Sequence, residues 1–232
     1  PKNIKAIQTT RNGGASLDKF SSFNLSSNVG DNEQHVNVNY KKLLNFIPSN
    51  PFWLNQIHSN KSEEIPSIAD LNCDASYTYN KKTVCAIRTA DCLPIFLTNS
   101  EGSFVGLIHA GWKGLLNGVI EKTIYKINSS SEIIIWLGPC ISQRSFEVGS
   151  NIYDSFIMND SNTKTAFKLE KNRYYLDLAA VAKIKLNFLN INNISGAGIT
   201  EEFCTFTDKK NFFSYRRDNK TGRMASLLWI DS

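Results

Sequence analysis

The fold class is decided by the segment TVCAIRTADCLPIFLTNSEGSFVGLIHAGWKGLLNGVIEKTIYKI, residues 83–127. Three runs rich in β-branched and aromatic residues, 83–89, 93–98 and 104–109, follow one another with no helical pattern between them. Residues 115–127 then place apolar side chains on one face at helical spacing. Because the strands cluster and do not alternate strictly with helices, the pattern favours an α+β fold of packed sheets with helices outside.

The remaining sequence adds elements of the same two kinds. Further strands are expected at residues 4–9, 53–58, 75–79, 132–137, 194–199 and 225–230. Amphipathic helices are expected at 151–158 and 177–189, the second with Asp177 as its N-cap. No internal repeat, long linker or break in composition divides the chain, so we expect a single domain over residues 1–232.

The composition is that of a soluble globular protein. Apolar residues make up 41% and charged residues 20% of the chain, and no apolar run approaches the ~20 residues that a membrane helix needs. Residues 1–10 lack the apolar core and the small-residue cleavage site of a signal peptide. We therefore expect a cytoplasmic protein with no membrane partner.

Charge and cysteine content argue against two further classes. The net charge of +5 is spread over the chain and its densest clusters are pairs of basic residues, whereas nucleic-acid binding is typical of a basic stripe or tail. We expect no nucleic-acid partner, and small anionic substrates suit this balance better. The five cysteines include no C-x-x-C pair, so neither a disulfide framework nor a zinc ribbon is indicated.

The candidate metal ligands are His58, Cys92 and His109. Each lies at the end of an expected strand, and the ends of neighbouring strands can converge in space. The remaining histidine, His35, lies instead in a polar stretch typical of a helix start. Two imidazoles and a thiolate are ligands that zinc prefers, and three protein ligands leave a fourth position for water or substrate. The pattern predicts zinc with an open position, able to activate water or polarise a substrate.

Asp91 and Gln56 lie beside these ligands, where packing alone would favour apolar residues. Asp91 directly precedes Cys92, and Gln56 lies two residues before His58. Asp91 could orient a metal-bound water or shuttle a proton. It could equally be a structural partner of the neighbouring ligand, and the sequence leaves both roles open.

The run HAGWKG at residues 109–114 leads from a strand into a helix. Glycines there let backbone N–H groups approach a ligand, and Lys113 near a helix N-terminus attracts anions, so phosphate could dock beside the metal. An ordinary glycine-rich turn is an equally good interpretation.

Arginines gather near the end of the sequence, around Arg217 and Arg223. The planar guanidinium suits phosphate or carboxylate, but exposed arginines commonly serve only as surface residues. Cys140 follows the expected strand 132–137 and lies either near the metal site or simply in the core.

Several motifs in order resemble the YfiH-like, or laccase-domain, family over nearly the whole chain. They are RNGGAS at 11–16, NQIH at 55–58, TADCLP at 89–94, HAGWKG at 109–114, GPCI at 138–141, FEVG at 146–149, SYRRD at 214–218 and TGR at 221–223. The resemblance implies a four-layer α/β/β/α sandwich with a catalytic zinc on His58, Cys92 and His109. It also implies a purine nucleoside phosphorylase that acts on adenosine, inosine and methylthioadenosine and has adenosine deaminase activity.

From these patterns we expect Asp91 and Cys92 to take part in catalysis. The residues expected to bind the nucleoside or the inorganic phosphate are Gln56, Lys113, Arg217 and Arg223. The partners would be a purine nucleoside and phosphate, and the protein a monomer or a small homo-oligomer.

The chain departs from the family pattern at a few positions. Lys113 replaces an arginine, which keeps the charge but loses the bidentate geometry that favours phosphate. The other departures are Ser59 for glycine, Ser142 for glycine and Phe146 for tyrosine. None of these changes touches an expected metal ligand.

Three alternative functions remain at this stage. A copper-containing polyphenol oxidase would agree with the older family label, but a multicopper site needs more imidazoles than the 3 histidines supply. A cysteine hydrolase would use Cys92 as nucleophile and His109 as base. A structural zinc site would need a fourth protein ligand, which Cys73, Cys85 or Cys140 could provide.

Overall fold

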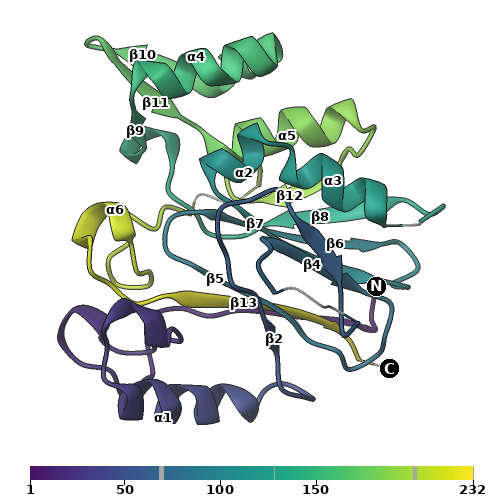
Figure 1. Ribbon diagram of the computed structural model, residues 1–232, viewed down its shortest axis with the longest axis vertical. Coiled ribbons are helices and arrows are strands. Elements are labelled where there is room, and N and C mark those ends of the chain that lie inside the picture. The colour runs from purple at the N-terminus through teal and green to yellow at the C-terminus, as the bar shows by residue number, and fades with distance from the viewer. Residues whose placement is uncertain (68–70, 128, 201–202, 232) are drawn as a thin grey trace.

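Two β-sheets lie face to face in the middle of the computed structural model, which describes residues 1–67, 71–127, 129–200 and 203–231 (Figure 1). The first sheet has the order β1 (Ile4–Gln8), β13 (Met224–Ile230), β5 (Cys85–Thr89), β2 (Phe52–Trp53). The second has the order β12 (Asn193–Gly196), β8 (Ile133–Leu137), β6 (Leu93–Asn99), β7 (Val105–Ala110), β4 (Ala75–Thr78), β3 (Ser62–Glu64).

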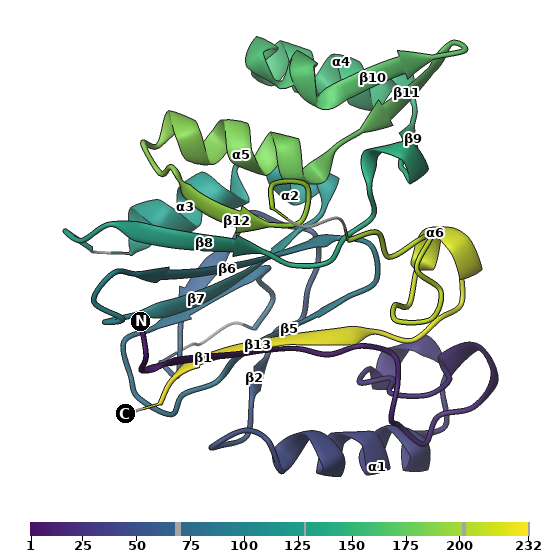
Figure 2. The same cartoon turned by 180° about the vertical axis from the view of Figure 1, so that it is seen from behind.

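Helices cover the outer face of each sheet (Figures 1 and 2). The first sheet is covered by α1 (Glu33–Leu44), and the second by α2 (Trp112–Leu116), α3 (Val119–Lys126) and α5 (Leu178–Phe188). The expected α+β class and the four-layer α/β/β/α sandwich are therefore confirmed. Among the described residues, none of the helices combines the length and apolar character that crossing a bilayer requires.

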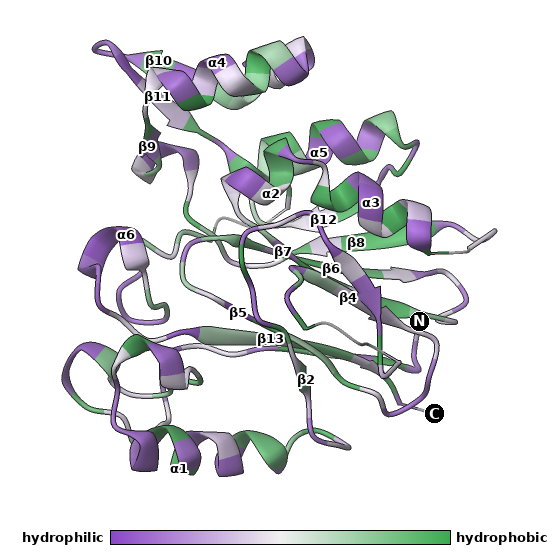
Figure 3. Ribbon diagram, viewed as in Figure 1, coloured by the Kyte–Doolittle hydropathy of each residue, from purple (hydrophilic) through white to green (hydrophobic). Residues whose placement is uncertain are grey.

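The strands of the two sheets carry apolar side chains on both faces. In β5, Cys85 and Ile87 join the core between the sheets, whereas Ala86 packs toward α1 with Leu43 and Leu227. Successive side chains of a strand point to opposite faces, so a strand buried on both faces reads as a continuous apolar run. Figure 3 shows α1 and α3 with hydrophilic and hydrophobic residues interleaved, as expected for helices with one buried face.

A smaller unit lies outside the layer of α2 and α5 (Figure 1). It contains α4 (Ser150–Asn159) and the sheet β10 (Phe167–Glu170), β11 (Arg173–Leu176), β9 (Glu147–Val148). Tyr153 of α4 stacks on Tyr174 of β11 with ring centroids 4.2 Å apart. The sequence patterns predict α4 but not the hairpin, whose strands are short and mostly exposed.

Short helices connect these elements. They are η1 (Asp18–Phe20), η2 (Ser27–Val29), η3 (Gln143–Ser145), η4 (Ser161–Ala166) and α6 (Tyr215–Asp218). The expected cap of α5 is confirmed, since the Asp177 side chain accepts a hydrogen bond of 3.0 Å from the Ala180 N–H.

Some sequence predictions were wrong in their boundaries. The expected helix 115–127 is divided between α2 and α3 because Gly118 adopts the left-handed region, with φ of 82°. The expected strand 53–58 ends already at Trp53, so that His58 lies in a loop with φ of 58°. The long helix α1 was anticipated only at its polar start.

Candidate metal centre

His58, Cys92 and His109 converge at one end of the two sheets. Their ligand atoms all lie within 4.8 Å of one another, and the Cys92 Sγ lies 3.8 Å from the His58 Nε2. The register of β6 on β7 pairs Leu93 with Ala110, which brings Cys92 and His109 together. His109 is 4% exposed, Cys92 is half-buried and His58 is exposed, so this group opens to solvent on the His58 side.

One buried carboxylate, Asp74, holds the imidazole of His109 and the backbone of His58. Its Oδ1 lies 2.8 Å from the His109 Nδ1 and accepts a hydrogen bond of 3.0 Å from the His58 backbone N–H. Its Oδ2 accepts from the backbone N–H and the hydroxyl of Ser59, at 2.6 and 2.8 Å. With Nδ1 engaged, His109 is left with Nε2 for a metal, the arrangement by which a carboxylate fixes the orientation of a ligand imidazole.

The charges of Cys92 and His109 stabilise each other. Burial opposes ionisation of Cys92, but the neighbouring imidazoles, His109 first, outweigh it and lower the pKa of Cys92 to about 6. Burial likewise disfavours the charged His109, yet the Cys92 thiolate and the Asp74 carboxylate raise the pKa of His109 to about 9. Cys92 is therefore a thiolate at neutral pH, the form that binds metals.

Gly111 allows this close approach. A Cβ atom at this position would lie 2.9 Å from the His58 Cδ2 and 3.1 Å from the Cys92 Sγ. The glycine turn therefore makes room for two of the three candidate ligands. The donor set and this packing both fit a metal ion held by two imidazoles and a thiolate.

Two cavities meet at the candidate metal centre. The larger, of about 720 Å³, is lined by Gln56, Arg88, Arg223 and all three candidate ligands. The smaller, of about 320 Å³, is lined by Asp91, Trp112, Lys113, Phe146, Leu178 and Arg216. Both are lined by His58, Ala90, Cys92 and Tyr215. Two small molecules could reach the centre from different sides.

Asp91 joins the loop of Cys92 to α6. Its Oδ1 accepts a hydrogen bond of 2.5 Å from the Thr205 hydroxyl, and its Oδ2 accepts one of 2.6 Å from the Arg216 backbone N–H. Asp91 also has φ of 97°, an uncommon conformation for a residue with a side chain. Strained backbone of this kind clusters at functional sites, and His58 shares it.

Gln56 and Arg223 line the larger cavity, but part of their hydrogen-bonding capacity is used by the backbone. The Gln56 amide donates to the Arg88 carbonyl and accepts from the Arg88 N–H, both at 2.7 Å, and so extends the edge of β5. The Arg223 Nη1 donates to the Thr221 carbonyl at 2.8 Å. Lys113 lies on the other side, in the smaller cavity, with Nζ 5.6 Å from the centroid of the Trp112 ring.

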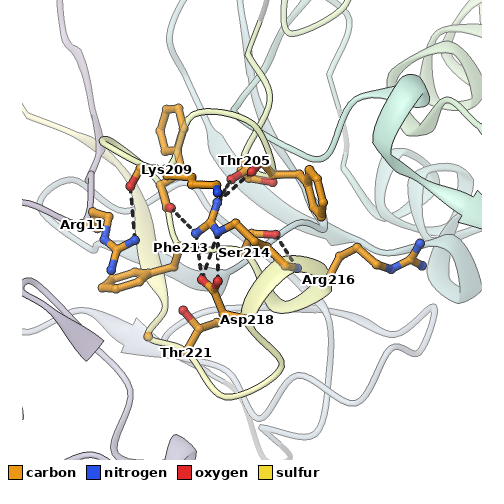
Figure 4. A network of polar contacts seen from close by, with 12 residues as sticks. Arg11, Thr205, Lys209, Phe213, Ser214, Arg216, Asp218 and Thr221 are labelled. Atoms are coloured by element: carbon orange, nitrogen blue, oxygen red, sulfur yellow. Dashed lines mark hydrogen bonds and ion pairs between the residues drawn. The ribbon is translucent and has the colours of Figure 1, made fainter. Parts of the chain in front are cut away.

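Arg217 is not brought to either cavity. Its guanidinium donates to the carbonyls of Thr205, Phe206 and Phe212 and pairs with Asp218 at 2.8 Å, and its side chain is 9% exposed. Figure 4 shows Asp218 and Thr205 on opposite sides of this network, with the Arg216 side chain extending away from it. Of the two adjacent arginines, Arg216 is the one that reaches a cavity.

The family model described as multi-copper polyphenol oxidoreductase laccase matches residues 5–231. The chain belongs to this family. Among curated members, a purine nucleoside phosphorylase of Haemophilus influenzae is 42% identical, over 100% of this chain and 96% of that one. The purine nucleoside phosphorylase YfiH of Escherichia coli is 40% identical, over 99% of this chain and 95% of its own.

Solved structures agree with the family assignment. A Neisseria meningitidis protein superposes with a TM-score of 0.93 at 36% identity, covering 100% of this chain and 96% of that one. The YfiH protein of Bacillus licheniformis superposes with a TM-score of 0.85 at 29% identity, covering 99% and 93%. These two proteins therefore share the fold of this chain.

Sequence reasoning missed Asp74, Arg88 and Tyr215 of this candidate site. A carboxylate directly before the buried strand β4 is the signal that could have found Asp74. Tyr215 and Arg88 carry no such signal, because only the fold places them on a cavity. Cys140 is 3% exposed and burial raises the pKa of its thiol, so it is part of the core.

Proposed function

We propose that the protein is a zinc-dependent purine nucleoside phosphorylase, with zinc held by His58, Cys92 and His109. The observation that carries the proposal is the position of these side chains where the two cavities meet. A transfer between two small molecules needs both of them at one centre. The names of the relatives supply the class of reaction.

Zinc suits this site better than a copper cluster. Two imidazoles and one thiolate form a tetrahedral zinc site with one position open. The remaining histidine, His35, lines a different cavity, beside Phe20 and Lys220. A multicopper centre needs more imidazoles than these. When bound, zinc would supply Lewis-acid polarisation of a substrate oxygen.

The proposed reaction is the phosphorolysis of adenosine, inosine or methylthioadenosine. An oxygen of HPO₄²⁻ forms a bond to C1′ of the sugar, and the C1′–N9 bond breaks with its electron pair on the purine. The proton of HPO₄²⁻ passes to the purine, which leaves as free base, and the sugar leaves as its 1-phosphate. As a side activity we propose hydrolytic deamination, in which adenosine and water give inosine and ammonia.

The chain's own residues orient and enclose the reactants. Asp74 fixes the tautomer and direction of His109. Asp91 acts in catalysis by positioning α6, which carries Tyr215 and Arg216 along the cavity walls. Lys113 and Arg223 contact substrate from opposite sides, whereas Gln56 and Arg217 support the walls through the backbone.

The test is to incubate zinc-loaded protein with inosine or adenosine, with and without phosphate, and to identify the products by chromatography. Free purine and ribose 1-phosphate that form only with phosphate are expected. Absence of free base under all conditions would refute the proposal. The variant His58→Ala should lose both zinc and activity, and a variant that lost activity but kept its zinc would contradict the ligand assignment.

A cysteine hydrolase is the second candidate, favoured by the low pKa of Cys92 beside His109. The two functions respond differently to chelation. A phosphorylase that needs zinc loses activity with a chelator and regains it with zinc. A hydrolase would survive complete removal of zinc and be lost to thiol alkylation, and copper with phosphate-independent oxidation would favour the polyphenol oxidase.

A further inference from the structure

The two cavities at the metal centre differ in chemical character. Of the described residues that line the larger cavity, two are arginines and none is acidic, and Ser26 and Asn28 add polar groups. The smaller cavity is lined by three aromatic rings and by aliphatic side chains, together with one carboxylate and two cations: Trp112, Phe146, Tyr215, Asp91, Lys113 and Arg216. The larger cavity is therefore electropositive and polar, whereas the smaller one offers flat apolar surfaces.

Arg88 in the larger cavity lacks an anionic partner. Its guanidinium stacks on the Trp53 ring, 3.9 Å from the centroid, and its Nε donates to the Leu25 carbonyl at 2.7 Å. No carboxylate among the described residues forms an ion pair with it. Burial lowers the pKa of Arg88 to about 10, with Tyr40 opposing, so the side chain is still cationic at neutral pH. A half-buried cation without a counter-charge is costly unless a ligand supplies one.

Arg223 contributes a second cation to the same cavity. Its Nη1 donates to the carbonyls of Thr221 and Gly222, which leaves the rest of its donor fork for the cavity. It also forms no ion pair with a described carboxylate. Two arginines in a cavity whose described lining includes no carboxylate match a tetrahedral dianion.

The cations of the smaller cavity are differently engaged. Arg216 lies over the Phe146 ring, 4.9 Å from the centroid, and donates to the Glu147 carbonyl at 2.8 Å. Lys113 faces the Trp112 ring. Aromatic faces and apolar side chains of this kind suit a planar base by stacking.

We propose that Arg88 and Arg223 form the binding site for inorganic phosphate in the larger cavity, and that the purine ring occupies the smaller cavity between Trp112 and Phe146. This assignment rests on the proposed phosphorylase function and adds to it the place of each reactant. It puts phosphate on the side away from Lys113, contrary to the expectation drawn from the glycine turn.

The experiment measures phosphate binding directly. Inorganic phosphate is titrated calorimetrically into the zinc-loaded protein and into Arg88→Gln, Arg223→Gln and Lys113→Gln. Loss of one charge-assisted contact should raise the phosphate dissociation constant at least about tenfold in both arginine variants. Lys113→Gln should raise the KM for inosine instead, and Arg144→Gln, which removes an exposed arginine outside both cavities, serves as the matched control.

Folding and ligand source are controlled in the same series. Because Arg88 stacks on Trp53, its substitution can affect folding as well as phosphate binding, and thermal melting checks that each variant is folded. Arg88→Lys keeps the positive charge and is measured in the same series. Arg223→Gln carries the test if Arg88→Gln does not fold. A phosphate group could also arrive on a nucleotide, so adenosine 5′-monophosphate is titrated alongside. Its binding at least tenfold more tightly than phosphate, through Arg88, would overturn the assignment in favour of a nucleotide.

The remaining outcomes separate this proposal from the function on which it rests. Unchanged phosphate affinity in both arginine variants, or a larger loss in Lys113→Gln, would overturn the placement even if the enzyme is a phosphorylase. Arg88-dependent phosphate binding without release of any purine base would support the anion site and refute the phosphorylase.

Discussion

Asp74 and Asp91 are two buried aspartates at the candidate metal centre, and they support different parts of it. Asp74 directs its oxygens to the His109 imidazole and to the backbone of the loop that carries His58. Asp91 directs both of its oxygens to Thr205 and α6. Asp91, which adjoins Cys92 in sequence, therefore supports a cavity wall. Asp74, which is distant from both histidines in sequence, supports the geometry of the candidate metal ligands.

The largest effect is expected from Asp74→Asn. The amide cannot replace a carboxylate that accepts from both imidazole segments, so zinc affinity should fall about 10- to 100-fold. Competition with a chromophoric chelator measures the affinity. Asp91→Asn is the matched control and should bind zinc as the unmodified protein does. Equal losses in the two variants would remove the distinction between the aspartates.

A smaller loss of zinc affinity, about tenfold, is expected from Gly111→Ala. Its methyl group would lie 2.9 Å from the ring of His58, whose backbone Asp74 holds in place. Gly149→Ala is the control, because Gly149 has an ordinary φ of −71° and would meet only the flexible Asn151 side chain. Normal zinc affinity in Gly111→Ala would mean that the His58 loop shifts at little cost, despite its hydrogen bond to Asp74.

Thr205→Val tests the Asp91 side. It removes the hydroxyl that donates to the Asp91 Oδ1 but leaves the metal ligands untouched. We expect kcat/KM for the nucleoside to fall about fivefold, the equivalent of one hydrogen bond of about 1 kcal/mol, with zinc content unchanged. Thr165→Val, at an exposed position of η4, is the control. A loss of zinc in Thr205→Val would place Asp91 in the support of the metal.

The smallest effect is expected for the alkylation rate of Cys204, which directly precedes Thr205 in the sequence. Burial raises its pKa, but hydrogen bonds from Ser142 and Thr207 outweigh it and lower the pKa to about 7. Because the thiolate is the reactive form, alkylation of zinc-loaded protein should accelerate as the pH rises toward about 7 and level off above it. Mass spectrometry should find Cys85 unmodified, since burial raises its pKa to about 12. A rate still rising steeply at pH 9 would contradict this.

The sequence predicted the local parts of the site and missed the parts that depend on tertiary contacts. The strands around Cys92 and His109 form a hairpin, so their convergence follows from short-range register. Asp74 reaches His109 across 35 positions of sequence, and no local pattern encodes that contact. The Arg217 side chain likewise points inward because the surrounding loop offers it backbone carbonyls, and this contact is also not encoded locally.

The strand order has a consequence for how the molecule assembles. In the first sheet β13 lies between β1 and β5, with Ile4 paired to Ile230. The edges of β1 and β5 that face β13 therefore have no partner until β13 itself has been synthesised, and such long-range pairing is slow. The metal ligands are synthesised long before this step. The cavity walls on α6 come only just before it, so a nascent chain can present thiolate and imidazoles before it can enclose a substrate.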